Sequence, residues 1–261
     1  MEMSEPLKEE IIRKQIERWE KRGEEKKNDW VHKLSTITVS VEAGSGGTLI
    51  AREVAERLDF DHFDKAIVEI IADSAEISED VVRAMERQRR SGIEDFIASC
   101  IEREYIYPGT YLKHLVHIVT AIGLHGHAVI VGRGANFILP SEERFAVRII
   151  AREELRIQNI SERFGISRED ARARVLNRDS KRTAFVKKSF RRDIADPIHY
   201  DVVVNSEGMK VEETAAGIAG HVLALREAMM REKSEAAGRG RDNPMEEINS
   251  NHPPPSSPRE S

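Results

Sequence analysis

A glycine-rich turn, Gly44-Ser45-Gly46-Gly47-Thr48, carries the clearest chemical signal in this sequence. The β-branched apolar run 36–41 precedes it, and an amphipathic helical pattern follows it to residue 58. A buried strand, a tight turn and a helix N-terminus in this order form a phosphate cradle. Glycines let several backbone N–H groups approach one anion, and the helix start adds partial positive charge. We therefore predict a phosphate site here; a glycine turn that only joins a strand to a helix is the alternative.

This turn differs from the standard P-loop pattern, G-x-x-x-x-G-K-[ST], at two positions. Val41 stands at the first glycine and Gly47 at the lysine, whereas Gly46 and Thr48 match the second glycine and the hydroxyl residue. The dinucleotide fingerprint fails as well, because Leu49 stands where its third glycine belongs. The P-loop lysine normally reaches the outer phosphates, so its loss is tolerable only if other cations converge on the turn.

Cations follow two other strand-like segments. The apolar run 128–131 predicts a buried parallel strand, and Arg133 emerges at its end between two glycines. A guanidinium beside a dry core is costly to leave unpaired, and a bound phosphate satisfies it bidentately; a structural salt bridge is the alternative.

The segment 60–65 sits where a second parallel strand ends, which favours Lys65 as a phosphate contact and Asp64 as a hydroxyl acceptor. Alternatively, both residues cap the next helix.

A strongly basic helix begins after Ser167, a good N-cap. Arg178 and Arg182 are i, i+4 neighbours that project from one face, and Asp179 between them could orient either one. Such basic density in a chain with a net charge of -5 indicates an anionic ligand. A basic helical hairpin that folds over a phosphate loop is a lid. A solvated helix and a nucleic-acid patch are the alternatives.

The elements that must position these residues fit one medium-sized domain with extensions, since the chain has 261 residues. Residues 1–34 form a charged amphipathic extension that packs on its own domain or mediates self-association. The domain spans 35–228, with a helical insertion at about 74–126 and a lid at about 165–195. A tail at 229–261, rich in Gly, Ser, Asn and Pro, is expected to be disordered. Further strands are predicted at 144–151 and 200–205, and a final helix from 211 to about 227.

Composition excludes several classes of protein. The net charge of -5 and pI near 6.0 argue against a nucleic-acid partner. The single cysteine, Cys100, excludes an internal disulfide and a cysteine-based zinc site. No apolar run approaches the roughly 18 residues of a membrane span, and charges begin at Glu2, unlike in a signal peptide. We therefore expect no membrane association and a cytoplasmic location.

Taken in order, these motifs resemble the cytidylate kinase-like family, a branch of the nucleoside monophosphate kinases. The resemblance covers roughly residues 35 to 226 and rests on the segments 40–47, 63–65, 131–134, 178–182 and 200–205. It implies a three-layer α/β fold in which helices flank a parallel sheet, with a helical monophosphate-binding insertion and a lid. The implied reaction transfers the γ-phosphoryl group of ATP to CMP or dCMP with Mg²⁺.

The same resemblance assigns roles to residues of the donor site and the lid. Residues 44–48 would hold the ATP phosphates, with the Thr48 hydroxyl near Mg²⁺. Arg178 and Arg182 match lid arginines that neutralise the transferring group.

On the acceptor side, Asp64 and Lys65 fall where the family's monophosphate site begins, and Lys65 would join the arginines in catalysis. Arg133 matches the arginine of the bacterial enzyme's Gly-Arg-Asp stretch, which contacts the monophosphate. Gly134 replaces the aspartate of that stretch, so a contact that recognises the pyrimidine nucleotide is absent or moved. Two other functions remain open: a non-catalytic nucleotide-binding protein of the same fold, and a kinase for another small acceptor.

Overall fold

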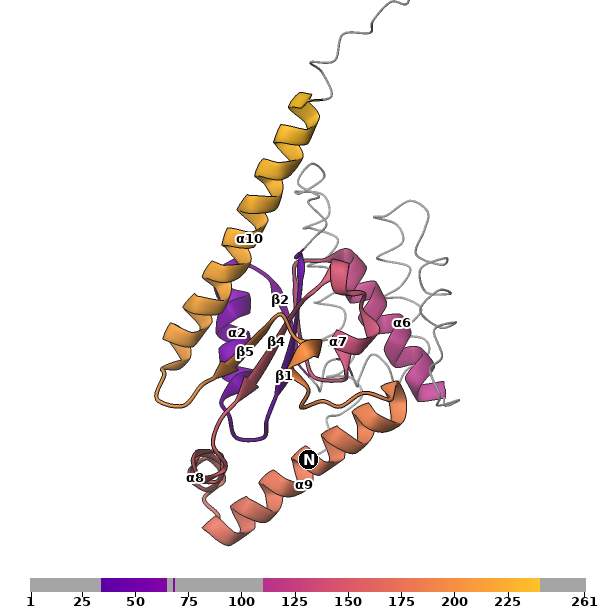
Figure 1. Cartoon of the computed structure of the whole chain (residues 1–261). Coiled ribbons are helices and arrows are strands. Elements are labelled where there is room, and N and C mark those ends of the chain that lie inside the picture. Colours follow the sequence, from indigo (N-terminus) through magenta and orange to yellow (C-terminus); the bar gives the residue numbers. More distant parts are fainter. Residues whose placement is uncertain (1–33, 65–67, 69–109, 240–261) are drawn as a thin grey trace, which may run out of the picture.

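An all-parallel sheet of five strands forms the centre of the protein in a computed structural model, which describes residues 34–64, 68 and 110–239 (Figure 1). The strand order is β2-β3-β1-β4-β5, and every neighbouring pair is parallel. This confirms the α/β fold expected from the sequence. The strands are β1 (Thr36–Val41), β2 (Asp61–Phe63), β3 (Ala128–Val131), β4 (Phe145–Ile150) and β5 (Val202–Asn205).

Helices cover both faces of this sheet, which gives the predicted three layers. In Figure 1, α2 and α10 lie on one face and α6 and α7 on the other, whereas α8 and α9 lie beyond the C-terminal ends of the strands. The helices are α2 (Gly47–Leu58), α6 (Thr110–His125), α7 (Ala135–Ile138), α8 (Glu153–Phe164), α9 (Arg168–Phe190) and α10 (Val211–Arg239), with 3₁₀ turns η1 (Ser141–Glu143) and η2 (Pro197–His199).

The central strand β1 is buried on both faces, as a parallel strand between two helical layers must be. Ile37, Val39 and Val41 alternate onto the side of α2 and α10 and join the core there. The residues between them are Thr36, Thr38 and Ser40, which face the opposite side. The apolar core of that side is built chiefly from α6, α7 and β3.

The chain leaves the neighbouring ends of β1 and β4 in opposite directions. From β1 it crosses toward β2, on the β3 side of the sheet, whereas from β4 it continues outward to β5. In open α/β sheets, ligands bind at such a switch point, outside the carboxyl ends of the strands. The loop after β1, residues 42–46, therefore occupies the position where the fold favours a ligand site.

Two element boundaries differ from the sequence-based expectation. The Asp201 carboxylate accepts a hydrogen bond from the Ala146 amide (2.6 Å), so the β4–β5 pairing begins at Val147 and Val202 and β5 starts after Asp201. Helix α10 runs to Arg239, so the prediction of a disordered tail is wrong for residues 229–239. This stretch is rich in Ala, Met, Glu, Lys and Arg, which are strong helix formers.

Several predictions lie outside the described residues. They are the N-terminal helix, Lys65, the insertion as far as residue 109, and the tail from residue 240. The helical character predicted for the insertion is confirmed for Thr110–His125. None of the helices within the described ranges has the length and apolar character needed to cross a bilayer.

Candidate functional site

The loop between β1 and α2 takes its shape from glycines in left-handed conformations. Gly44 has φ 85° and Gly46 has φ 76°, and Gly46 is the residue that precedes helix α2. A Cβ atom on Gly44 would lie 2.4 Å from the backbone carbonyl oxygen of Arg156, so α8 approaches the loop too closely for any side chain. Alternating backbone handedness of this kind turns successive amides toward a common concave side, where an anion can bind.

The carbonyl groups of the loop are held by hydrogen bonds from other parts of the protein. Asn159 of α8 donates to the Gly44 carbonyl (2.8 Å), and Ser206, after β5, donates to the Ser45 carbonyl (2.8 Å). The Ser45 hydroxyl donates to the Glu42 carbonyl (2.9 Å). With these carbonyls fixed, the peptide planes of the loop are fixed as well.

Some of the loop amides remain available as donors. Within the described part of the chain, no hydrogen bond uses the amides of Gly44, Gly46 or Thr48, or the Thr48 hydroxyl. These donors surround the N-terminus of α2, where the helix dipole favours negative charge. The arrangement is that of an anion site with its donors in place before the ligand arrives.

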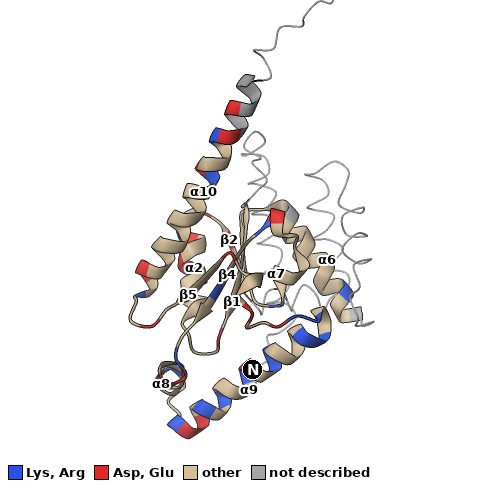
Figure 2. Cartoon of the chain, in the orientation of Figure 1, with Lys and Arg blue, Asp and Glu red and all other residues tan. Residues whose placement is uncertain are grey.

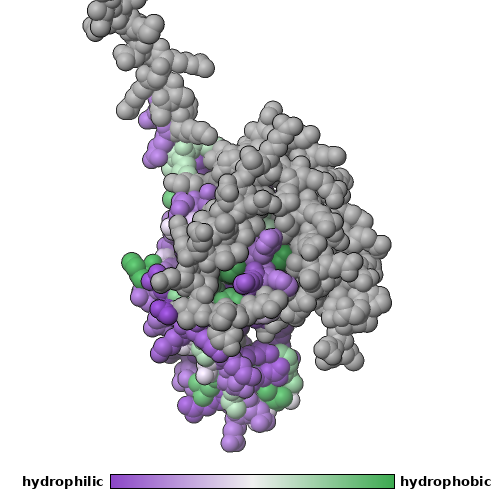
Figure 3. All heavy atoms as spheres, turned by 90° about the vertical axis from the view of Figure 1, so that its right-hand side faces the viewer, coloured by the Kyte–Doolittle hydropathy of each residue, from purple (hydrophilic) through white to green (hydrophobic). Residues whose placement is uncertain are grey.

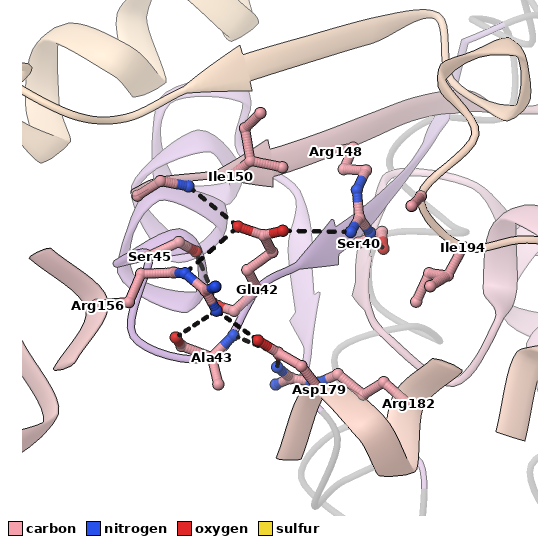
Figure 4. Close-up of polar contacts among 12 residues, drawn as sticks. Ser40, Glu42, Ala43, Ser45, Arg148, Ile150, Arg156, Asp179, Arg182 and Ile194 are labelled. Carbon is pink, nitrogen blue, oxygen red and sulfur yellow. Dashed lines mark hydrogen bonds and ion pairs between the residues drawn. The ribbon is translucent and has the colours of Figure 1, made fainter. Parts of the chain in front are cut away.

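Helix α9 is attached to this loop through Asp179. The Asp179 Oδ1 atom accepts hydrogen bonds from the Ala43 amide (2.9 Å) and from Nη1 of Arg182 (3.1 Å), while Oδ2 pairs with Arg156 of α8. Figure 4 shows the Asp179 carboxylate between the loop and the Arg182 guanidinium. Of the two arginines that Asp179 was expected to orient, the structure therefore selects Arg182.

A second carboxylate, Glu42, lies between two buried arginines. Arg148 stands in the middle of apolar β4 and is only 7% exposed. It donates to Ser40 (3.0 Å) and lies 3.6 Å from Oε1 of Glu42, whose Oε2 lies 3.5 Å from Nε of Arg156 (Figure 4). Sequence reasoning missed this network, and the signal was an arginine inside an otherwise apolar strand. It joins the β1 loop to β4 and α8.

Arg133 lies at the end of β3 in a left-handed conformation, with φ 57°. Burial, and to a smaller extent the positive charge of Arg182, together lower the pKa of Arg133 to about 10. The guanidinium still carries its charge at neutral pH. Two arginines that are far apart in the sequence, one after β3 and one on α9, therefore lie near enough for their like charges to interact.

Arg178 continues this series of cations along α9. Partial burial lowers the pKa of Arg178, and the charges of Arg174, Arg182 and Arg163 lower it further. The guanidinium carbon of Arg178 lies 5.8 Å from the Phe164 ring centroid, and that of Arg174 only 3.8 Å. Basic residues follow α9 along its length (Figure 2), and the end of the molecule that α8 and α9 form is largely hydrophilic (Figure 3).

Asp64 follows β2 directly, at the predicted strand end. Its backbone carbonyl accepts from the Val68 amide (3.1 Å), a bond with helical spacing that fits the capping alternative. Its carboxylate acts electrostatically on His62. Its predicted partner, Lys65, lies outside the described residues.

Gly134 provides a close approach for an aromatic ring. A Cβ atom at Gly134 would lie 2.3 Å from the Phe190 ring, at the end of α9, and the backbone there is left-handed (φ 67°). Phe190 in turn stacks on Phe137 with ring centroids 5.6 Å apart. Phe190 therefore occupies the space in which an aspartate side chain at position 134 would begin.

Comparison with known proteins bears on the family and the fold of the chain. No curated protein matches the chain. Among solved structures, an uncharacterized protein from Eubacterium ventriosum is similar in fold, with a TM-score of 0.57, 18% identity, and coverage of 72% of this chain and 98% of that one. A shikimate kinase from Bacteroides thetaiotaomicron also matches, with a TM-score of 0.37, 13% identity, and coverage of 74% of this chain and 98% of that one. A shikimate kinase from Acinetobacter baumannii matches with a TM-score of 0.39, 12% identity, and coverage of 74% of this chain and 96% of that one. The model of the cytidylate kinase-like family matches residues 36–208, which is more than half of the sequence. The chain belongs to the cytidylate kinase-like family.

Proposed function

We propose that this protein is a phosphotransferase that moves the γ-phosphoryl group of ATP to a nucleoside monophosphate, CMP or dCMP. Membership of a kinase-like family supports the reaction class. The observation that carries the proposal is that Asp179 holds Arg182 at the loop, near enough to Arg133 for the two charges to interact, while the amides of Gly44, Gly46 and Thr48 remain available as donors. Like charges are brought together at a structural cost, and a polyphosphate between them would offset that cost.

The proposed roles follow from position. The amides of Gly44, Gly46 and Thr48 hold the donor phosphates, and Arg133 holds the acceptor phosphate. Arg182 and Arg178 donate to the equatorial oxygens of the transferring group, where negative charge spreads in the transition state. Phosphoryl transfer needs little covalent chemistry from the protein, so these fixed donors supply most of the catalysis.

Magnesium fits this site through the ligands that it prefers in kinases. The described ranges contain no group of three or more His, Cys, Asp or Glu side chains that could hold a metal ion by themselves. Mg²⁺ commonly binds through few protein oxygens together with substrate phosphates and water. The Thr48 hydroxyl would be such a ligand, and the ion would neutralise phosphate charge.

Gly134 favours a second candidate, a kinase for another small acceptor. The resemblance assigns recognition of the pyrimidine to an aspartate at this position, and Phe190 fills the space for such a side chain. The acceptor is therefore recognised by other residues, and these can suit a different molecule.

ATP turnover against a panel of acceptors tests the proposal. We expect ADP formation that depends on CMP or dCMP and on Mg²⁺, with UMP and AMP as comparisons. Arg182→Ala should lower the turnover number by about a hundredfold, because one charged donor contributes about 3 kcal/mol to the transition state. ATP binding should weaken much less, and Lys181→Ala, an exposed neighbour on α9, serves as the control. Binding of nucleotide without turnover for any acceptor would favour the non-catalytic alternative.

A further inference from the structure

We propose that Arg182 supplies the positive charge that the lysine provides in a standard P-loop, and that Asp179 is the residue that positions it. This inference rests on the proposed function, since it assigns a role within the same site. It follows from two independent observations: there is no room for a lysine at Gly47, and α9 holds a guanidinium beside the loop.

The steric observation concerns the first carbon of any side chain at position 47. A Cβ atom on Gly47 would lie 2.5 Å from Cγ1 of Val41 and 3.2 Å from Cβ of Ile149. Both neighbours belong to the packed core, with exposures of 8% and 0%, so neither can move without opening a cavity. Gly47 is therefore required here, although its φ is not in the left-handed region.

The two departures from the P-loop pattern, Val41 and Gly47, are therefore coupled by packing. Val41 stands at the first-glycine position, and its side chain fills the space that the lysine stem would need. The valine adds apolar area to the core of α2, α10 and the sheet, while the loop loses its cation. These positions are separate in the sequence, but their packing shows that a side chain at position 47 requires a smaller residue at position 41.

The replacement cation comes from the opposite side of the loop. Asp179 accepts from the Ala43 amide and from Arg182 through the same oxygen, Oδ1. This shared oxygen fixes the Arg182 guanidinium relative to the loop backbone. Arg156, which is buried and pairs with Oδ2, limits rotation of the carboxylate. The Arg182 side chain is 36% exposed, so it remains open to a ligand entering from solvent.

Grafting the lysine back into the loop tests this substitution of roles. Gly47→Lys alone should strongly lower the free energy of unfolding. The double variant Val41→Gly/Gly47→Lys should lose less unfolding free energy than the two single variants lose in sum. Arg182→Ala alone should lose about a hundredfold in turnover number. Adding the double graft to Arg182→Ala should raise the turnover number at least about tenfold above that of Arg182→Ala alone. The inference is overturned if Arg182→Ala keeps wild-type turnover, or if the graft folds and binds ADP but restores nothing.

The positioning role of Asp179 has its own readout. Asp179→Asn should lower the turnover number about tenfold or more while changing the KM for ATP much less, because the arginine is present but poorly aimed. Glu169→Gln, an exposed acid in the first turn of the same helix, is the matched control. Equal losses in both variants, or a loss confined to thermal stability, would contradict the role.

Failure of the proposed function can be told apart from failure of this inference. If wild-type protein forms no ADP with any acceptor, the proposed reaction is wrong, and calorimetric binding of ATP and ADP then tests the inference directly. Arg182→Ala should weaken ATP binding more than ADP binding, because the lysine of a P-loop reaches the outermost phosphates. Equal weakening of both nucleotides would overturn it.

Discussion

Arg133 combines a half-buried charged side chain with a left-handed backbone conformation, and both oppose stability. Its neighbours Gly132 and Gly134 also have positive φ, so the whole turn after β3 is in the left-handed region. Burial and the nearby Arg182 both act against the charged form. Such a combination is typical of functional sites, so we predict that Arg133 binds a ligand.

Replacing Arg133 should therefore separate function from stability. Arg133→Met is expected to raise the KM for the acceptor by about 10- to 100-fold, the loss of one charge-assisted contact. The melting temperature of the ligand-free protein should change little, because the side chain is only half-buried and methionine keeps an apolar stem of similar length. Differential scanning fluorimetry and steady-state kinetics measure both effects. Arg231→Met, at an exposed site on α10, should change neither, and a fall in melting temperature with unchanged kinetics would make Arg133 structural.

His62 gives the protein a pH-dependent stability. Burial lowers the pKa of His62 from its ordinary value of 6.5, Asp64 opposes the shift, and Arg52 adds to it. The unfolded chain then binds a proton more readily than the folded one, so the unfolding free energy must decrease as pH falls below about 6.5. His62→Leu should flatten the decrease between pH 7 and 5 in urea titrations. The two proteins should be compared at pH 8, where both forms are neutral; an unchanged slope would show that other groups cause the decrease.

At the residue scale, the sequence shows which chemical groups are present, but not which side chains pack against them. The position of Arg133 just after a buried strand was predictable from the apolar run 128–131. The sequence also shows glycines at 47 and 134, but not that Val41 and Phe190 occupy the space beside them. Those contacts join residues that are distant in the chain, and they depend on the final packing.

Among the elements, the hairpin of α8 and α9 forms the outer wall of the site. Its ends were predictable, because their signals are local: Gly165 ends α8 with φ 61°, and the Ser167 hydroxyl accepts from the Asp170 amide (3.0 Å) to begin α9. What the hairpin contacts was not predictable. Asn159 donates to the loop and Asp179 accepts from it, and each of these hydrogen bonds joins residues more than a hundred positions apart.

The contribution of α8 can be measured at Asn159. Asn159→Ala removes the hydrogen bond to the Gly44 carbonyl and should cost about 1 kcal/mol of stability. The loop amides would then be less fixed, so the KM for ATP should rise several-fold while the turnover number changes less. Gln158→Ala, at the adjacent residue, is the control, since its side chain bonds only to exposed Glu162. Identical kinetics for the two variants would show that the loop keeps its shape without α8.

For the whole molecule, the distribution of charge matters more than its sum. The chain carries a net charge of -5, yet the segments that meet outside the carboxyl ends of β1 and β3 bring Arg133, Arg178 and Arg182 into one electrostatic group. The fold brings these residues together, because β3 neighbours β1 in the sheet and Asp179 joins α9 to the loop after β1. The order of the motifs along the sequence indicated such a site, and the crossing of α9 over the loop required the folded structure.

An inorganic polyphosphate should therefore stabilise the entire protein, without any nucleoside. At about a hundred times its dissociation constant, tripolyphosphate would add about 2.7 kcal/mol to the unfolding free energy. That corresponds to a rise in melting temperature of about 5–10 °C for a domain of this size. Sodium chloride at the same ionic strength only screens the repulsion between the arginines and should produce a much smaller rise. The double variant Arg133→Met/Arg182→Ala should lose most of the tripolyphosphate effect, whereas Arg231→Met keeps it. A rise that is equal in chloride, or that survives in the double variant, would mean that the polyanion binds elsewhere and that the arginines do not form one site.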